Sequence, residues 1–363
     1  TYEQDWMSET FHGLRAVREV PGRAAAWQHA LDEAAAERDL TLLWCMATPP
    51  DFLETLRLGQ INAIRTSGDY QYLYDNALNW VWFLHTNALA RALGLWPYKD
   101  VFLSHDKTPE GFGEPLAEAE ALLAALSGGP VGIGDQIGHA RRERVMRTCR
   151  EDGVLVKPDL PVAAIDRCFA RHAYLAEQAL VGETWSRHPV GRYVYVVVMN
   201  ACHATKEPAR ELAWQLAPRE LGEAAPTTPA IVLDWREGRA RELEPEGVLE
   251  GRLAYQDFAY FVLCPLARTG VAVLGDLCRY VVAGDRRIAG VSEAEEGVRF
   301  EVHGAPGSQV DVHLWARRPL RAARAFAPCD GARVEIVPGA EAERHLARVG
   351  LGSSGFARIT VLA

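Results

Sequence analysis

Ile61-Asn62-Ala63-Ile64-Arg65-Thr66-Ser67-Gly68-Asp69 is the stretch that decides the fold, because a short apolar run passes directly into polar, turn-forming residues. Further apolar runs of strand length lie on both sides of it, at 2–7, 40–46, 100–104 and 130–134. Helical periodicity fills the intervals, at 24–37, 51–58, 73–93, 114–126 and 140–150. Strands that alternate with helices predict βα units and a parallel sheet. Each unit takes about 30 residues, which is typical of a (β/α)₈ barrel.

The number of predicted strands is five, three fewer than a complete barrel needs. An open doubly wound sheet is the alternative, but no Gly-rich dinucleotide fingerprint follows these strands. The sequence begins with Thr1-Tyr2-Glu3, which reads as the interior of a structural element. Since unpaired barrel edges are a liability, we expect the upstream part of the same barrel to precede Thr1. At the start of the predicted helix 51–58, Asp51 and Glu54 have the spacing of a capping box.

From about Arg192 the pattern changes to period-two strands separated by turn residues. We expect strands at 193–199, 231–235, 258–263, 271–274, 299–303, 309–315, 333–337 and 356–362. This pattern predicts an antiparallel β-sandwich domain, with 205–229 as a long surface connection inside it. The predicted organisation is therefore α/β plus all-β, with a barrel part at 1–185 and the sandwich at 186–363.

Composition excludes several classes of function. The 363 residues carry a formal net charge of −9, whereas a nucleic-acid binder needs a basic face. No apolar run approaches the roughly 20 residues that span a bilayer, so we expect no membrane partner. The seven cysteines form no CxxC motif or Cys/His cluster, so we expect free thiols, no metal and no cofactor. The oligomeric state and the compartment stay open.

Acidic and aromatic residues follow the predicted strands. The active site of a barrel lies at the carboxyl ends of its strands, where Asp5, Trp6, Asp69 and Asp135 are placed. Two carboxylates that face one pocket are what glycoside hydrolysis requires, one to attack the anomeric carbon and one to protonate the departing oxygen. The ring of Trp6 offers a flat apolar face to a sugar.

The stretch Arg65-Thr66-Ser67-Gly68-Asp69-Tyr70 resembles the R-x-S-x-D acid/base motif of glycoside hydrolase family 36, the raffinose-synthase and α-galactosidase group. Three further stretches resemble family segments in the same order, namely 96–105, 127–135 and 152–169. The resemblance implies that Asp69 is the general acid/base and that Asp5, which matches the aspartate of the family's K-x-D motif, is the nucleophile. The visible strands would then be strands four to eight of the barrel. The family's Lys is replaced by Glu3, a change that alters which sugar hydroxyls are bound.

The resemblance implies a retaining α-glycoside hydrolase, α-galactosidase-like in mechanism, acting on a carbohydrate. Substrate-binding residues would be Glu3, Trp6, Arg65, Tyr70 and Asp135, with Arg65 orienting a carboxylate. A raffinose-synthase-like transglycosidase and a non-catalytic carbohydrate-binding protein on a degenerate barrel are the alternatives.

Each residue also has an ordinary structural interpretation. Asp5 could be a solvated strand end, Asp69 a turn or helix N-cap, and Asp135 a turn residue. Three further residues near the strands are expected to be structural, namely Cys45, Asp100 and His105.

Overall fold

A computed structural model of the chain describes residues 1–69, 76–106, 113–206, 210–326, 331–339 and 341–363. Its N-terminal part contains a parallel sheet in the order β1-β2-β3-β4. The strands are β1 (Tyr2–Gln4), β2 (Leu42–Trp44), β3 (Ile61–Arg65) and β4 (Trp96–Tyr98). Each strand pairs with the next one along the chain, which confirms the βα units. This order is the one that neighbouring strands of a barrel have.

The predicted strand at 100–104 is wrong, because β4 forms four residues earlier, at Trp96–Tyr98. The segments 100–104 and 130–134 meet only in an isolated parallel bridge between Phe102 and Ile133. Proline at 130 lacks a backbone donor, and glycines flank it at 128, 129, 132 and 134, so a regular ladder is not favoured there. Among the residues that the structure describes, the parallel sheet is open rather than closed into a barrel.

Eight α-helices and three short 3₁₀ helices are described. The α-helices are α1 (Met7–Gly13), α2 (Arg15–Glu19), α3 (Arg23–Ala36), α4 (Pro49–Glu54), α5 (Ala77–Ala92), α6 (Ala117–Leu126), α7 (Arg142–Met146) and α8 (Asp166–Ala170). The 3₁₀ helices are η1 (Thr55–Arg57), η2 (His203–Thr205) and η3 (Pro218–Ala224). The predicted helices at 24–37, 73–93 and 114–126 are confirmed as α3, α5 and α6. α6 begins three residues later than predicted, and residues 73–75 of the second prediction lie outside the described residues. Of the predicted helix at 140–150, only Arg142–Met146 is helical, as α7.

The start of α4 differs from the predicted capping box. Thr48, not Asp51, is the N-cap, and Pro49 follows at the first helical position, where a missing N–H costs nothing. The carboxylate of Asp51 lies at the third position and accepts the Thr48 N–H at 2.7 Å. Glu54 faces His29 of α3 at 3.1 Å instead. The box is therefore real, but it begins three residues earlier.

The two faces of the parallel sheet differ in chemistry. One face is apolar and packs Trp44 and Ile64 with Met7, Ala35 and Phe52 from the surrounding helices. On the other face, the small apolar cluster of Leu43, Ala63 and Tyr98 is bordered by charged residues. The apolar helix residues pack on the first face, and the described polar side chains at the strand ends gather on the second.

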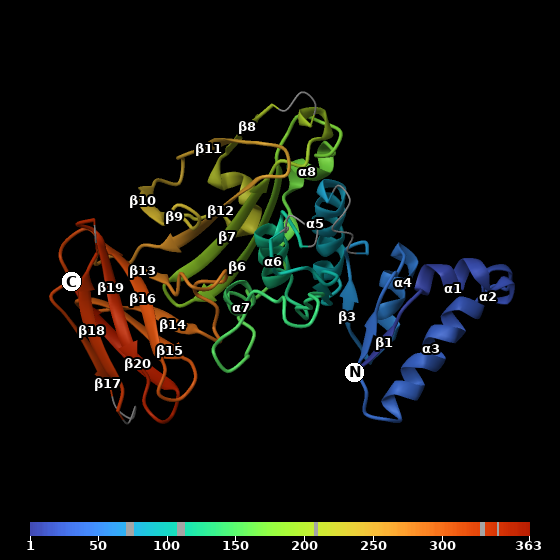
Figure 1. Ribbon diagram of the computed structural model, residues 1–363, viewed down its shortest axis with the longest axis horizontal. Coiled ribbons are helices and arrows are strands. Elements are labelled where there is room, and N and C mark those ends of the chain that lie inside the picture. The colour runs from blue at the N-terminus through green and yellow to red at the C-terminus, as the bar shows by residue number, and fades with distance from the viewer. Residues whose placement is uncertain (70–75, 107–112, 207–209, 327–330, 340) are drawn as a thin grey trace.

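The rest of the chain is antiparallel. A six-stranded sheet has the order β10-β9-β12-β7-β6-β5, a hairpin-like pair joins β11 to β8, and two four-stranded sheets have the orders β13-β16-β19-β18 and β14-β15-β20-β17. The strands are β5 (Ala163–Ala164), β6 (Leu180–His188), β7 (Gly191–Met199), β8 (Leu212–Leu216), β9 (Ala230–Asp234), β10 (Arg239–Leu243), β11 (Leu249–Leu253), β12 (Phe258–Pro265), β13 (Val271–Gly275), β14 (Ile288–Ala294), β15 (Gly297–His303), β16 (Gln309–Ala316), β17 (Ala322–Phe326), β18 (Arg333–Pro338), β19 (Arg344–Gly350) and β20 (Phe356–Leu362). The sheets β13–β20 and the helices α1–α4 lie at opposite ends of the long axis (Figure 1).

The eight strands predicted for the second half are all present, which confirms its antiparallel, sheet-rich character. The segment 205–229, predicted to be a plain connection, contains β8 and η3. The division of the chain at residues 185 and 186 stays a prediction; β6 runs across it.

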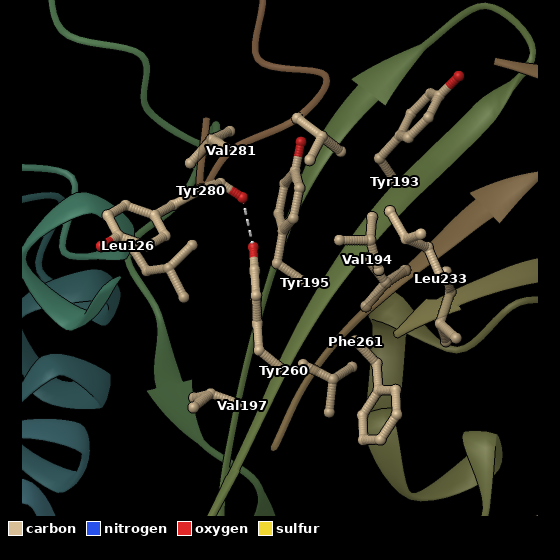
Figure 2. Packing of buried hydrophobic residues seen from close by; sticks show 14 of the residues in the cluster. Leu126, Tyr193, Val194, Tyr195, Val197, Leu233, Tyr260, Phe261, Tyr280 and Val281 are labelled. Atoms are coloured by element: carbon tan, nitrogen blue, oxygen red, sulfur yellow. Dashed lines mark hydrogen bonds between the residues drawn. The ribbon is translucent and has the colours of Figure 1, made fainter. Parts of the chain in front are cut away.

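A continuous core holds the middle of the molecule together (Figure 2). Leu126 of α6, the valines and tyrosines of β7, and the loop after β13 pack against one another. The hydroxyl of Tyr260 on β12 donates to the Tyr280 carbonyl at 2.7 Å, so that even the buried phenol is satisfied. The parallel sheet therefore connects through α5 and α6 to a rigid antiparallel support.

Candidate functional site

Asp5, Cys45 and Arg65 form a row across the carboxyl ends of β1, β2 and β3. The residues two positions earlier on the three strands, Glu3, Leu43 and Ala63, are partners in the parallel register. Side chains two residues apart in a strand point to the same side of a sheet, so the three side chains share the face opposite the helices. Arg65 is itself the register partner of Tyr98 on β4, which extends the row to the fourth strand.

The carboxylate of Asp5 is held by two donors. Its Oδ1 accepts the backbone N–H of Trp6 at 2.7 Å, and the thiol of Cys45 donates to it from the neighbouring strand. Burial, together with the carboxylate beside it, raises the pKa of the Cys45 thiol, so this donor stays protonated. The two donors, one from its own strand end and one from the end of β2, fix the orientation of the carboxylate.

The residues that follow Asp5 and Cys45 have unusual backbone conformations. Trp6 and Met46 have φ angles of 59° and 54°, in the left-handed region that non-glycine residues seldom adopt. Both strands thus turn sharply after the row, and the backbone strain is kept in place by the surrounding pairing. The Trp6 ring is 60% exposed, so it borders the row without being part of the core.

Arg65 connects two carboxylates on different elements. Its Nη2 lies 2.7 Å from Oδ1 of Asp69, and its Nη1 lies 3.6 Å from Oδ2 of Asp100. The guanidinium side chain is 8% exposed, whereas that of Asp69 is 57% exposed. Burial lowers the pKa of Arg65, but its acidic neighbours outweigh burial and raise it overall. A fixed cation thus lies between one open and one partly buried carboxylate.

Glu3 lies on the same face, two residues before Asp5 on β1. Its carboxylate accepts the hydroxyl of Tyr98 across the sheet at 3.2 Å. Burial, followed by the charge of Glu3, raises the pKa of the Tyr98 hydroxyl, so this group acts as a proton donor over the whole physiological range. Four strands therefore contribute polar groups to one continuous surface.

The loop that carries Asp69 is held by side chains of α5. The Thr66 hydroxyl donates to Oδ1 of Asn87 at 2.5 Å, and the Gly68 N–H donates to Oδ1 of Asn79 at 3.1 Å. The hydroxyl of Ser67 accepts the N–H of Asp100 at 2.9 Å. Asn87 is completely buried and its amide also donates to the Val162 carbonyl, which ties the loop to the antiparallel part. The position of Asp69 is therefore set from three sides.

A cavity of about 670 Å³ opens beside this loop. It is enclosed by the loop after β3, the loop after β2, the start of α1 and one side of α5; the lining residues include Met46, Phe52, Arg65, Asp69 and Trp82. Its walls are mainly apolar. Asp5 and Glu3 are not among its lining residues.

The structure brings four of the predicted site residues to one sheet edge, namely Glu3, Asp5, Arg65 and Asp69, with Trp6 at its border. Tyr70 lies outside the described residues. Every one of these assignments to a role stays a prediction.

Asp135 lies in a different setting. Its side chain is 1% exposed and its two oxygens accept the Ser104 N–H at 2.9 and 3.0 Å, while Nδ1 of His105 lies 2.6 Å from Oδ1. Burial would raise the pKa of this carboxyl, but the hydrogen bonds from His105 and Ser104 outweigh it and lower the pKa. Asp135 joins its own loop to the loop of Ser104 and His105, and neither of these two residues belongs to the row.

Sequence reasoning missed Cys45, Tyr98 and Asp100 as members of this surface. Cys45 follows β2 as Asp5 follows β1, so the same rule of strand ends could have found it. Asp100 was assigned to the wrong end of its strand because β4 was placed four residues too late. Trp82 carried no signal, because an aromatic residue within a helical pattern usually belongs to the core.

Within the described ranges, no group of three or more His, Cys, Asp or Glu side chains has the geometry to hold a metal ion. The described helices include none that is both long enough and apolar enough to cross a membrane.

Comparison with known proteins finds no matching family model and no matching curated protein. Three of the solved structures that share a partial likeness are, by name, glycoside hydrolases. The first is α-galactosidase I from Mortierella vinacea, with a TM-score of 0.44 and 11% identity, and the match covers 67% of this chain and 63% of that one. The second is a putative α-N-acetylgalactosaminidase from Bacillus halodurans C-125, with a TM-score of 0.38 and 11% identity over 67% of this chain and 62% of that one. The third is isomalto-dextranase from Arthrobacter globiformis T6, with a TM-score of 0.39 and 13% identity over 93% of this chain and 61% of that one. The chain spans less than two thirds of the length of each. At these scores none of the likenesses establishes an activity.

Proposed function

We propose that the chain is the catalytic part of a retaining α-glycoside hydrolase, α-galactosidase-like in mechanism and related to glycoside hydrolase family 36, with Asp5 as nucleophile and Asp69 as general acid/base. The observation that carries the proposal is the row at the strand ends. Asp5 and Asp69 lie at the carboxyl ends of β1 and β3 and are connected through Cys45 and Arg65. The motif resemblance at 65–70 points to the same two residues.

In the first step, the Asp5 carboxylate attacks the anomeric carbon of an α-linked sugar. The bond from that carbon to the bridging oxygen breaks, and Asp69 gives its proton to the departing oxygen. A β-linked glycosyl ester of Asp5 and a neutral alcohol result. In the second step, Asp69 removes a proton from water, whose oxygen attacks the same carbon and releases Asp5. Two inversions restore the α configuration.

Arg65 has a definite part in this scheme. To protonate the departing oxygen, Asp69 has to leave its ion pair with Arg65, because the guanidinium occupies Oδ1 of Asp69 at 2.7 Å. Asp100, already 3.6 Å from the same guanidinium, then keeps Arg65 paired. Substrate that enters between Arg65 and Asp69 would separate this pair and leave Arg65 with Asp100 as its partner. In the substrate complex we expect the carboxyls of Asp5 and Asp69 to lie about 5–5.5 Å apart.

Sugar recognition falls to Glu3, Tyr98 and Trp6 in this proposal. The carboxylate of Glu3 accepts hydrogen bonds, so it binds sugar hydroxyls as donors, whereas the family's lysine offers a cation at that place. We therefore expect the preferred α-glycoside to differ from the simple galactoside in hydroxyl orientation, and the first assay has to cover several sugars.

The test is a panel of 4-nitrophenyl α-glycosides, followed by azide rescue. Asp5→Gly with azide should yield the β-glycosyl azide, because azide attacks the substrate directly with one inversion. Asp69→Ala with azide should yield the α-glycosyl azide, because azide attacks the ester after a first inversion. Asp285→Asn is the control and should keep full activity, because this side chain is 63% exposed and lies between β13 and β14, outside the parallel sheet.

Loss of activity without these stereochemical outcomes would contradict the assignment of Asp5 and Asp69. Binding of sugars with no turnover of any α-glycoside would instead support a non-catalytic carbohydrate-binding protein.

A further inference from the structure

The cavity beside Asp69 has no role in the steps above. We propose that it holds the leaving group of the substrate as a neutral ring, a second sugar or an aryl group, stacked on the indole of Trp82. This assignment rests on the proposed function and adds a binding residue and a substrate class to it.

Trp82 has the properties of a stacking surface. It lies on α5, a helix that buries Trp80, Phe83 and Leu84 in the core, and yet Trp82 is 55% exposed and lines the cavity. Its ring lies next to the loop that carries the acid, since a Cβ added at Gly68 would be 3.4 Å from Cζ3. An exposed indole beside apolar walls offers the flat surface against which the apolar face of a ring packs.

The chemistry of the acid places the leaving group on this side. A general acid has to lie within hydrogen-bonding distance of the oxygen that it protonates, and this oxygen belongs to the leaving group. The first ring beyond that oxygen therefore lies within one ring length of Asp69. Asp69 lines the cavity, whereas Asp5, which has to touch the anomeric carbon, is not among its lining residues. The sugar that is transferred and the group that leaves consequently occupy different sides of the loop.

Size and charge define the class of leaving group. A volume of about 670 Å³ is in the range of small-molecule sites and accommodates one or two rings. Glu9 and Asp69 are acidic groups of the lining. Arg65 is its only Lys or Arg side chain among the described residues, and it is already paired with Asp69 and Asp100. An anionic leaving group such as a phosphate would meet carboxylates, so a neutral ring is favoured.

The test compares two substrates with the same transferred sugar, taken from the panel above. A 4-nitrophenyl α-glycoside has a ring as its leaving group, and the corresponding α-glycosyl fluoride has none. Trp82→Ala should lower kcat/KM for the nitrophenyl glycoside about tenfold, as expected for the loss of a stacked aromatic anchor. The same variant should hydrolyse the fluoride as fast as the unmodified protein. An α-linked disaccharide, as a third arm, separates sugar from aryl leaving groups.

Leu78→Ala is the matched control. Leu78 lies one turn earlier on α5 and is 47% exposed, but it does not line the cavity, so both substrates should react normally. An equal loss on fluoride and nitrophenyl glycoside in Trp82→Ala, or no loss on either, would overturn the assignment of the cavity. Failure of the unmodified protein to hydrolyse any α-glycosyl fluoride is a separate outcome that overturns the proposed function itself.

Discussion

Asn87 of α5 offers a sharp test of how the Asp69 loop is held. It is completely buried, accepts the Thr66 hydroxyl at 2.5 Å and donates to the Val162 carbonyl at 2.9 Å. Asn87→Leu keeps the number and branching of the side-chain heavy atoms but removes the hydrogen bonds to Thr66 and Val162. The Thr66 hydroxyl retains only a long contact of 3.4 Å to the Tyr98 carbonyl. We therefore expect a loss of about 1–3 kcal/mol in the free energy of unfolding, from the cost of unsatisfied buried groups.

The assay is urea unfolding followed by circular dichroism, with Thr66→Val and the double variant completing a cycle. Because the two side chains are in contact, we expect a coupling of about 1 kcal/mol between them. The folded Asn87→Leu protein should also lose kcat/KM, since the loop that carries the acid is released on one side. A change in unfolding free energy below about 0.5 kcal/mol, with unchanged activity, would refute the reasoning.

Three further predictions concern stability. Arg287, 2% exposed, contacts Asp276 at 2.7 Å and both oxygens of Glu151 at 2.8 and 2.9 Å. Arg287→Met should lower the unfolding free energy in urea by about 1.5–3 kcal/mol, because Asp276 and Glu151 lose charged hydrogen bonds and keep only Arg279 as a cation. A loss below about 0.5 kcal/mol would contradict this. Burial lowers the pKa of Lys157 from 10.5 to about 7. Between these two values the unfolded chain binds more protons than the folded chain, so the free energy of unfolding should rise from pH 7 to 10. Lys157→Met should remove that rise. Gly275 has a φ of +95°, and a Cβ there would lie 2.2 Å from a backbone oxygen, whereas a Cβ at Gly153, with a φ of +83°, would meet open space. Gly275→Ala should therefore lower the melting temperature much more than Gly153→Ala. Equal losses in melting temperature would contradict this prediction.

The antiparallel half could be predicted well from the sequence because its strands alternate apolar and polar residues between clear turns. Segments such as 193–199, almost wholly apolar, are also unambiguous in length. Prediction failed where local pattern and pairing disagree. Val101-Phe102-Leu103 has the composition of a strand, but its potential partners are glycines beside a proline, so the ladder forms at Trp96–Tyr98 instead.

The same displacement explains the incomplete site. Asp5 and Arg65 were predicted correctly to lie at strand ends, since β1 and β3 were placed within a few residues. Asp100 was excluded because an error of four residues moved it from the carboxyl end of a strand to the amino end. The exposure of Trp82 depends on the width of the opening between α5 and the loop after β2, which no local pattern encodes.

The most direct measurement is peptide mapping by mass spectrometry of Asp69→Ala after reaction with an α-glycosyl fluoride. Fluoride leaves without an acid, while the ester forms but loses the base that activates water, so it should accumulate. We predict one glycosyl group on the N-terminal peptide, attached to Asp5 and absent when Asp5→Asn is added. A glycosyl group on any other residue, or none despite release of fluoride, would contradict the assignment of Asp5 as nucleophile.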